Sequence, residues 1–198
     1  MAGTFNDMEG RHEGSQGVTT TPACIRGCVP GDEQALALVG QATFLESFAG
    51  VLDGADILAH CARQHSPEIY RAWIGDPKAR IWLAELEPRG APVGYLVLAP
   101  ATLPLADLED DDLEIKRIYL LQRVQGTGLG KRLMLEAVSY ARQARRSRLL
   151  LGVYGRNDRA IGFYQRQGFR PIGERRFLVG NTYYDDLILG LDLSLEVR

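Results

Sequence analysis

The first third of the chain consists of helix-forming stretches that are separated by glycine and proline breaks, and aromatic residues project from them. The predicted helices run from Glu33 to about Ala49, from Asp53 or Asp56 through Ala62, and over a short stretch that opens at Ser66-Pro67 and carries Tyr70, Trp73 and Ile74. Asp32 is expected to cap the first helix with its side chain.

From Arg80 onward the pattern changes to short apolar and β-branched runs between turn residues, which indicates strands. The predicted strands are Arg80–Leu86, Val93–Leu98, Ile115–Leu121, Leu149–Tyr154, Arg170–Val179 and Tyr183–Leu193, with one short strand earlier in the chain at Cys24–Val29. Two more helices are predicted, from Leu129 to about Arg145 and from Asn157 to the glycine at Gly168. Gly180-Asn181 is a hairpin signal between the last two strands.

The order of these elements predicts an α/β (α+β) fold with a mixed central sheet of about seven strands, flanked by helices on both faces. The strand–helix–strand–helix–strand succession that starts at Ile115 implies parallel pairing in that part of the sheet. The hairpins on either side of it are expected to be antiparallel.

Composition limits the classes of protein to consider. The 198 residues suffice for one domain, which we predict over residues 22–198, whereas residues 1–21 are polar, glycine-rich and predicted to be a disordered tail. A net charge of −2 gives no general attraction to nucleic acid or to anionic membranes. No run approaches the roughly 20 apolar residues of a membrane span, so we expect a cytoplasmic protein without a membrane partner. The three cysteines form neither a disulfide framework nor a zinc pattern, and no metal is expected.

A glycine-rich segment stands between a predicted strand and a predicted helix. It reads Gln125-Gly126-Thr127-Gly128-Leu129-Gly130-Lys131. The first amides of a helix have no partner inside the helix, and the helix dipole favours negative charge in front of them. Alternate glycines allow a close approach of a ligand to the backbone, and Lys131 adds a cation. We interpret this segment as a pyrophosphate-binding cradle rather than as an ordinary turn with glycines for packing.

Two motifs at the expected separation resemble the GNAT superfamily of acyl-CoA-dependent N-acetyltransferases. The first is Gln/Arg-x-x-Gly-x-Gly/Ala, here Gln125–Gly130, and the second is an Asn followed by Phe-Tyr-x-x-x-Gly-Phe, here Asn157 and Phe163–Phe169. The resemblance covers about Ile25–Leu193. The segment Phe44–Phe48 and the helical stretch to Trp73 also look, more loosely, like the bacterial spermidine/spermine acetyltransferase branch.

The resemblance implies the GNAT fold, acetyl-CoA as cosubstrate and a site between the strand that ends at Leu121 and the strand Leu149–Tyr154. It implies that the pantetheine pairs with backbone at Ile118, Tyr119 and Leu120, and that the pyrophosphate lies on the amides of Gln125, Gly126, Thr127, Gly128, Leu129, Gly130 and Lys131. Asn157 would contact the pantetheine arm, although it can also cap its helix. The hydroxyl of Tyr164 would lie near the sulfur. A homodimer is common in the family.

Acetyl transfer to an amine needs a neutral amine, donors for the oxyanion and a proton for the leaving thiolate. Tyr164 is the candidate proton donor, and the alternative is a core aromatic beside Phe163. A backbone amide near Leu120 is the expected oxyanion donor. Glu114 is the candidate base, acting through a water, because related enzymes often place a carboxylate at the start of this strand; the alternative is a solvated acidic residue in the run 109–114.

Phe44, Phe48, Trp73 and Tyr184 are candidates to line the acceptor pocket, with a plain core role as the alternative.

We expect direct attack by a primary amine of a small molecule in a ternary complex. A polyamine is favoured by the acidic run, in which Asp110–Asp112 can attract a cationic amine, and by the looser likeness to the spermidine/spermine branch. An amino acid, an aminoglycoside-like antibiotic, and a protein N-terminus or lysine are the alternative acceptors. A non-catalytic acyl-CoA-binding sensor is the alternative from another class.

Overall fold

The computed structural model describes residues 22–179 and 182–194. The predicted tail at residues 1–21 and the hairpin signal at Gly180-Asn181 lie outside the described residues. The helices and strands are β1 (Ala23–Gly27), α1 (Glu33–Phe48), α2 (Gly54–Gln64), α3 (Pro67–Gly75), β2 (Arg80–Leu86), β3 (Ala91–Pro100), β4 (Leu113–Leu120), a 3₁₀ turn η1 (Gln122–Val124), α4 (Leu129–Gln143), β5 (Arg148–Tyr154), α5 (Asp158–Arg166), β6 (Arg170–Val179) and β7 (Thr182–Asp192).

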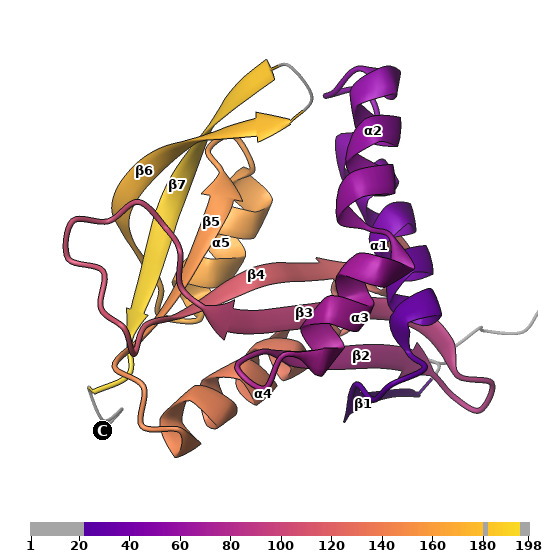
Figure 1. Ribbon diagram of the computed structural model, residues 1–198, viewed down its shortest axis with the longest axis horizontal. Helices are drawn as coiled ribbons and strands as arrows, with labels where there is room; N and C mark the ends of the chain where they lie inside the picture. The colour runs from indigo at the N-terminus through magenta and orange to yellow at the C-terminus, as the bar shows by residue number, and fades with distance from the viewer. Residues whose placement is uncertain (1–21, 180–181, 195–198) are drawn as a thin grey trace, which may run out of the picture.

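The strands form one mixed sheet in the order β1-β2-β3-β4-β5-β7-β6, with helices on both faces, which confirms the predicted fold class (Figure 1). The prediction of parallel pairing through the second half holds only for β4 and β5. β7 enters between β5 and β6 and runs antiparallel to both. The reason is burial: Ile188 and Leu189 of β7 are completely buried, whereas β6 is polar, contains Pro171 and suits the edge of the sheet.

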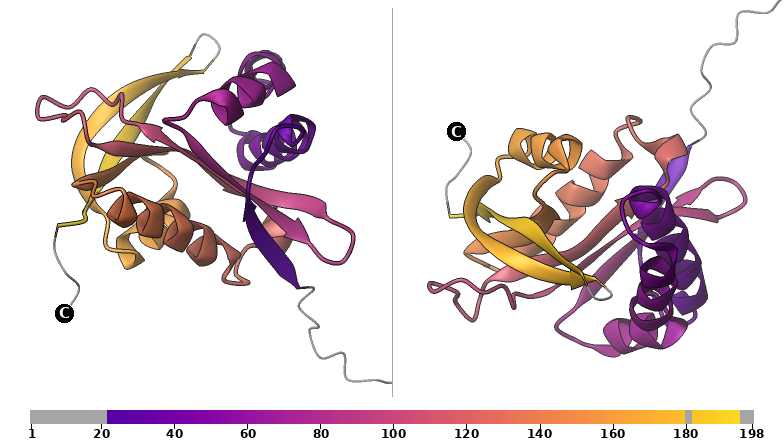
Figure 2. Two further views of the ribbon diagram at one scale, coloured as in Figure 1. Left: turned by 60° about the horizontal axis from the view of Figure 1, so that its bottom comes forward. Right: turned by 90° about the horizontal axis from the view of Figure 1, so that it is seen from above.

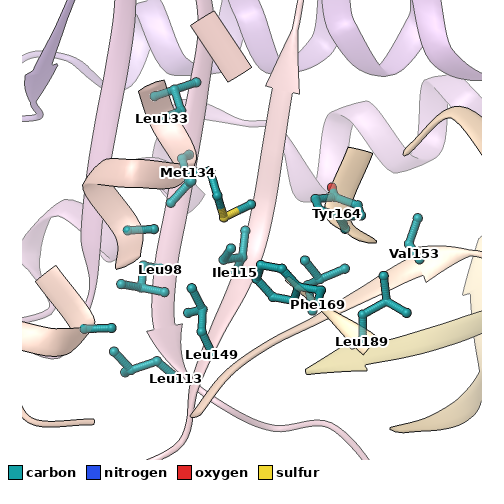
Figure 3. Packing of buried hydrophobic residues seen from close by; sticks show 14 of the residues in the cluster. Leu98, Leu113, Ile115, Leu133, Met134, Leu149, Val153, Tyr164, Phe169 and Leu189 are labelled. Carbon is teal, nitrogen blue, oxygen red and sulfur yellow. The ribbon is translucent and has the colours of Figure 1, made fainter. Parts of the chain in front are cut away.

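Each face of the sheet has its own hydrophobic cluster, because successive side chains of a strand point to opposite faces. On β3, Tyr95 and Val97 pack with α1 and α3, whereas Leu96 and Leu98 pack on the side of α4. Figure 2 shows α1, α2 and α3 on one side of the sheet and α4 and α5 on the other. The α4 side holds the larger cluster, part of which is drawn in Figure 3.

The third helix begins at the predicted place, and of the two predicted helix caps one is present and one is not. Ser66 accepts a hydrogen bond from the amide of Ile69 (3.5 Å), and Asn157 accepts one from the amide of Ala160 (3.1 Å). The predicted cap by Asp32 is wrong. Its carboxylate instead accepts two hydrogen bonds from Arg26, each 2.8 Å long, because its backbone is already helical and turns the side chain away from the helix.

β4 and β5 separate soon after they meet. Only Leu113 and Glu114 of β4 pair with β5, opposite Leu149 and Leu150, although both strands continue. Figure 1 shows the two strands diverging from that point. In β4 the pairing with β3 also shifts, since Val97 faces Arg117 while Leu98 faces Ile115, so that Lys116 is a β-bulge. The separation of the strands leaves one edge of β4 unpaired beside a bulge.

Among the described residues, no helix is both long and apolar enough to cross a membrane.

The acidic run before β4 contributes to the fold. The buried carboxylate of Asp112 accepts hydrogen bonds from Nε and Nη2 of Arg148, at 2.9 and 2.6 Å, and Asp107 accepts another from the same guanidinium. The hydroxyl of Ser147 donates to Asp111. These contacts tie the loop after β3 to the start of β5.

Replacement of Arg148 by Met should lower the free energy of unfolding by about 3 kcal/mol, because Asp112 would remain buried without its partner. Urea denaturation measures the change. The control is Arg142→Met, at an exposed position in the last turn of α4, which should cost less than about 1 kcal/mol. Equal losses in the two variants would show that the buried pair adds nothing to stability.

Candidate active site

A cavity of about 740 Å³ lies where β4 and β5 separate. Its wall consists of β4, the glycine cradle, β5 and α5, with Ser47, Phe48 and Val51 from the end of α1 and the residues after it. Ten of the twelve residues predicted to bind acetyl-CoA line it: Ile118, Tyr119, Leu120, Gln125, Gly126, Gly128, Gly130, Lys131, Asn157 and Tyr164. The structure therefore brings together residues from the two sequence motifs around one space.

The cradle is a left-handed turn that leads into α4. Gly126 and Gly128 have φ angles of +83° and +87°, which only glycine adopts without strain, and a side chain at either position would project into open space. The Gln125 side chain donates to the carbonyl of Leu120 (3.0 Å), and the Thr127 hydroxyl donates to that of Val124 (2.7 Å). These side chains brace the turn and leave the first amides of α4 to face the cavity.

Two predicted cofactor residues do not line the cavity, and the reasons are local. The hydroxyl of Thr127 is used inside the turn, and the Leu129 side chain is only 2% exposed within the core under α4. The side chains of these two residues therefore position the cradle.

The cavity fits the group that the motifs imply. Glycines leave room for a pyrophosphate at the helix N-terminus, and Lys131, Arg156, Arg159 and Arg166 add positive charge to the wall. The unpaired edge of β4 offers backbone groups to an extended, amide-containing arm. Among residues 22–179 and 182–194, no group of three or more His, Cys, Asp and Glu side chains is arranged to hold a metal ion.

Tyr164 lies at the inner end of this cavity. Its ring packs edge-on against Phe163 and Phe169, and the residue is 8% exposed. Figure 3 shows Tyr164 and Phe169 within the hydrophobic cluster. Burial, together with the nearby Tyr119, raises the pKa of Tyr164 above its usual value. The phenol therefore stays protonated at neutral pH, as a proton donor requires.

A second cavity, of about 140 Å³, opens on the α1 side of the same gap. Three of the four residues predicted to line an acceptor pocket are in its wall: Phe44, Phe48 and Tyr184. The two cavities share Phe48, Arg117, Tyr119, Gly152 and Tyr154, among other residues. The fourth candidate, Trp73, lines neither cavity and stacks on the guanidinium of Arg117, 4.7 Å from its ring centre.

Glu114 is not in the wall of either cavity. It is 5% exposed, pairs with Lys116 and accepts hydrogen bonds from the amide and hydroxyl of Thr102. Its carboxylate is therefore held by other groups of the fold. This position does not favour the predicted base role, which stays a prediction.

Sequence reasoning missed the charged residues of the second cavity: Lys116, Arg117, Arg175 and Asp186. Arg117 is two residues before Tyr119, and Asp186 is two residues after Tyr184. Residues two apart in a strand point to the same face, and both tyrosines had been predicted to be in the site. That alternation was the available signal. Burial raises the pKa of Asp186, although Arg175 opposes the shift through a contact of 3.1 Å.

Behind the second cavity lies a buried polar network. Tyr70 donates to Tyr95 (2.9 Å) and bonds to Nδ1 of His65 (2.8 Å), and Nη1 of Arg117 donates to the Tyr70 hydroxyl (3.1 Å). Burial, with a contribution from Arg117, lowers the pKa of His65 to about 2. The ring is therefore neutral and adds no charge to the network.

Comparison with known proteins identifies the family. Residues 52–169, which include the cradle, Asn157 and Tyr164, match the acetyltransferase (GNAT) family, and the chain belongs to it. The uncharacterized N-acetyltransferase Rv2669 of Mycobacterium tuberculosis is 28% identical over 82% of this chain and 98% of its own. The peptidyl-lysine N-acetyltransferase YjaB of Escherichia coli is 28% identical over 60% of this chain and 67% of its own.

Among solved structures, the PaiA N-acetyltransferase of Thermoplasma acidophilum in complex with coenzyme A superposes with a TM-score of 0.70 at 19% identity, over 86% of this chain and 99% of that one. The predicted family, fold and enzyme class are thus confirmed: the chain is an N-acetyltransferase. The likeness to the spermidine/spermine branch stays a prediction.

Replacement of Gly128 by Val should weaken coenzyme A binding by at least about 10-fold, because the side chain would occupy the space in front of the α4 amides. Titration calorimetry with coenzyme A measures the dissociation constant.

The matched control is Gly90→Val in the turn between β2 and β3. Gly90 also has a positive φ, +67°, with nothing within 4 Å, and it lines neither cavity. This variant has a similar backbone strain, and its dissociation constant for coenzyme A should lie within about twofold of that of the wild type. Equal affinities in both variants would place the pyrophosphate elsewhere.

Proposed function

We propose that this N-acetyltransferase moves the acetyl group of acetyl-CoA to a primary amine of a small molecule by direct attack in a ternary complex. The observation that supports the proposal is the wall shared by the two cavities. One cavity holds the anion-binding cradle, the other lies under α1, and they meet where β4 and β5 separate. A donor and an acceptor can therefore reach each other across this gap without an acetyl-enzyme.

Acetyl-CoA supplies the acetyl group as a thioester. The pantetheine lies along Ile118, Tyr119 and Leu120, the pyrophosphate on the amides from Gln125 to Lys131, and Asn157 beside the arm. The backbone at the end of β4 supplies the donor for the developing negative charge on the carbonyl oxygen. A C–N bond forms, the C–S bond breaks, and Tyr164 gives its proton to the sulfur. The amine loses one proton to solvent or to a nearby carboxylate, and Tyr164 is reprotonated.

Two alternatives remain as outcomes to test. A peptide lysine as acceptor is favoured by the likeness to YjaB, a peptidyl-lysine N-acetyltransferase. A non-catalytic sensor is the alternative from another class, and the intact Tyr164 argues against it. The assay mixes enzyme and acetyl-CoA with a panel of small amines and lysine peptides, and follows the release of free thiol. Binding of coenzyme A without thiol release for any amine or peptide of the panel would exclude the proposed acetyl transfer.

A cytoplasmic location and a possible homodimer stay predictions of the sequence and of the resemblance. We propose no metal for the reaction, since neither a metal ion nor a redox step is needed to move an acetyl group from a thioester to an amine.

Replacement of Tyr164 by Phe should lower turnover by about 10- to 1000-fold, because the leaving sulfur loses its proton donor. Binding of acetyl-CoA should change little, since the ring remains. Steady-state kinetics from pH 6 to 10 and calorimetry measure the two effects.

The matched control is Tyr140→Phe, which removes a phenol from α4, where Tyr140 packs on Trp82 and lines neither cavity. Its turnover should equal that of the wild type. Wild-type turnover of the Tyr164 variant at all pH values would refute the acid role.

A further inference from the structure

Arg117 is a cation at the wall shared by the two cavities, and its contacts are with neutral groups. Nη1 donates to the carbonyl of Gln64 (2.6 Å) and to the hydroxyl of Tyr70 (3.1 Å), and Nη2 lies 3.4 Å from the side-chain oxygen of Gln64. No ion pair joins Arg117 to a carboxylate in the part of the chain that the structure describes. A partly buried charge without a counter-charge is costly to a fold.

The guanidinium is also held in place. It lies over the rings of Trp73 and Tyr70, at 4.7 and 5.5 Å from their centres. β4 fixes its backbone, while α2 and α3 supply the groups that contact its side chain. A planar donor fork that is immobilised in this way is suited to recognise an anion, because little side-chain freedom is lost on binding.

The remaining charges of the second cavity are paired. Lys116 forms an ion pair with Glu114, and Arg175 forms one with Asp186. When Glu114, which lies outside the wall, is counted with its partner Lys116, one positive charge remains in excess, that of Arg117. This charge opposes the entry of a polyamine. The acidic run that favoured a polyamine lines neither cavity, and Asp112 and Asp107 within or beside it pair with Arg148.

Asp186 offers a complementary group on the opposite wall. Both contacts from Arg175 go to Oδ2. In the described part of the chain, no group donates a hydrogen bond to Oδ1. Among the described residues, the only buried side-chain polar atom without a partner is Nε of Arg146, so Oδ1 is accessible to solvent. This oxygen is consequently available on a residue that lines the cavity. A carboxylate there can hold an ammonium group or take its proton.

We propose that the second cavity is a site for an acceptor that carries an anionic group, such as a carboxylate, besides its amine. The anion binds to Arg117, and the amine lies on the side of Asp186. The proposal rests on the proposed function, since it names the acceptor class of the same site. The anion of the acceptor supplies the counter-charge that Arg117 lacks in the fold.

The experiment compares amines with and without an α-carboxylate: L-alanine and L-phenylalanine, each beside its α-carboxamide, together with putrescine and spermidine. Thiol release from acetyl-CoA gives kcat/KM for each amine. The acid of at least one pair should exceed its amide by about 10- to 100-fold, the effect of a hydrogen-bonded pair to a charged group. The amine of an amide is the less basic of each pair, so protonation favours the amide and cannot produce this preference.

Replacement of Arg117 by Gln should bring the ratio of acid to amide close to one, and Arg117→Lys should keep part of it, which guards against a folding defect in the first variant. The control is Arg80→Gln. Arg80 also stacks on a ring, that of Tyr140, and lines neither cavity, so its ratio should equal that of the wild type.

A wild-type ratio at or below one, or polyamines as the best acceptors, would overturn the inference and leave the N-acetyltransferase function standing. An acid-to-amide ratio of kcat/KM that is unchanged by Arg117→Gln would show that the anion does not bind to Arg117, which would also overturn the inference. No thiol release with any amine or with lysine peptides would defeat the proposed function itself, and the inference with it.

Discussion

The unpaired edge of β4 is the feature on which the rest of this structure depends. Backbone amides and carbonyls away from solvent need partners, and a sheet normally supplies them from the next strand. Here the pairing with β5 stops after Glu114 and Leu150, so that the remaining polar groups of β4 face a gap. The bulge at Lys116, the glycine cradle at the far end of β4 and the small residue Gly152 on β5 all keep this gap open. A ligand with amides of its own can complete the sheet there.

The same gap joins the two sides of the molecule. The donor cavity reaches from the cradle and α5 to the end of α1, and it shares wall residues of β4 and β5 with the acceptor cavity. Gly152 illustrates how closely the parts fit, since a Cβ atom at this position would lie 2.4 Å from a guanidinium nitrogen of Arg175. The absence of this atom leaves room for the guanidinium of Arg175, which pairs with Asp186. Charge placement in the acceptor cavity thus depends on the absence of one methyl group from β5.

Local patterns allowed the fold and the donor site to be predicted. The cradle, Asn157 and Tyr164 lie in short motifs whose geometry is set by nearby residues. The acceptor side was harder, because it depends on which strands are neighbours and on one bulge. The bulge at Lys116 interrupts the alternation of side chains along β4. The sequence alone therefore does not say whether Arg117 lies on the same face of the sheet as Ile115 or on the other face. Glu114 and Trp73 were chosen by position along the chain, and Asp186 was missed because β7 was not expected beside β5.

The insertion of β7 between β5 and β6 has a consequence for the order in which the molecule is built. On the ribosome, β4, the cradle, β5 and α5 emerge before β6 and β7, and they carry nearly all of the donor site. One edge of β5 then stays unpaired until both β6 and β7 have been synthesised, because β7 is the strand that pairs with it. During this interval the exposed edge can pair with other chains. The wall with Tyr184 and Asp186 is the last part of the site to be made, so a nascent chain completes its donor side before its acceptor side.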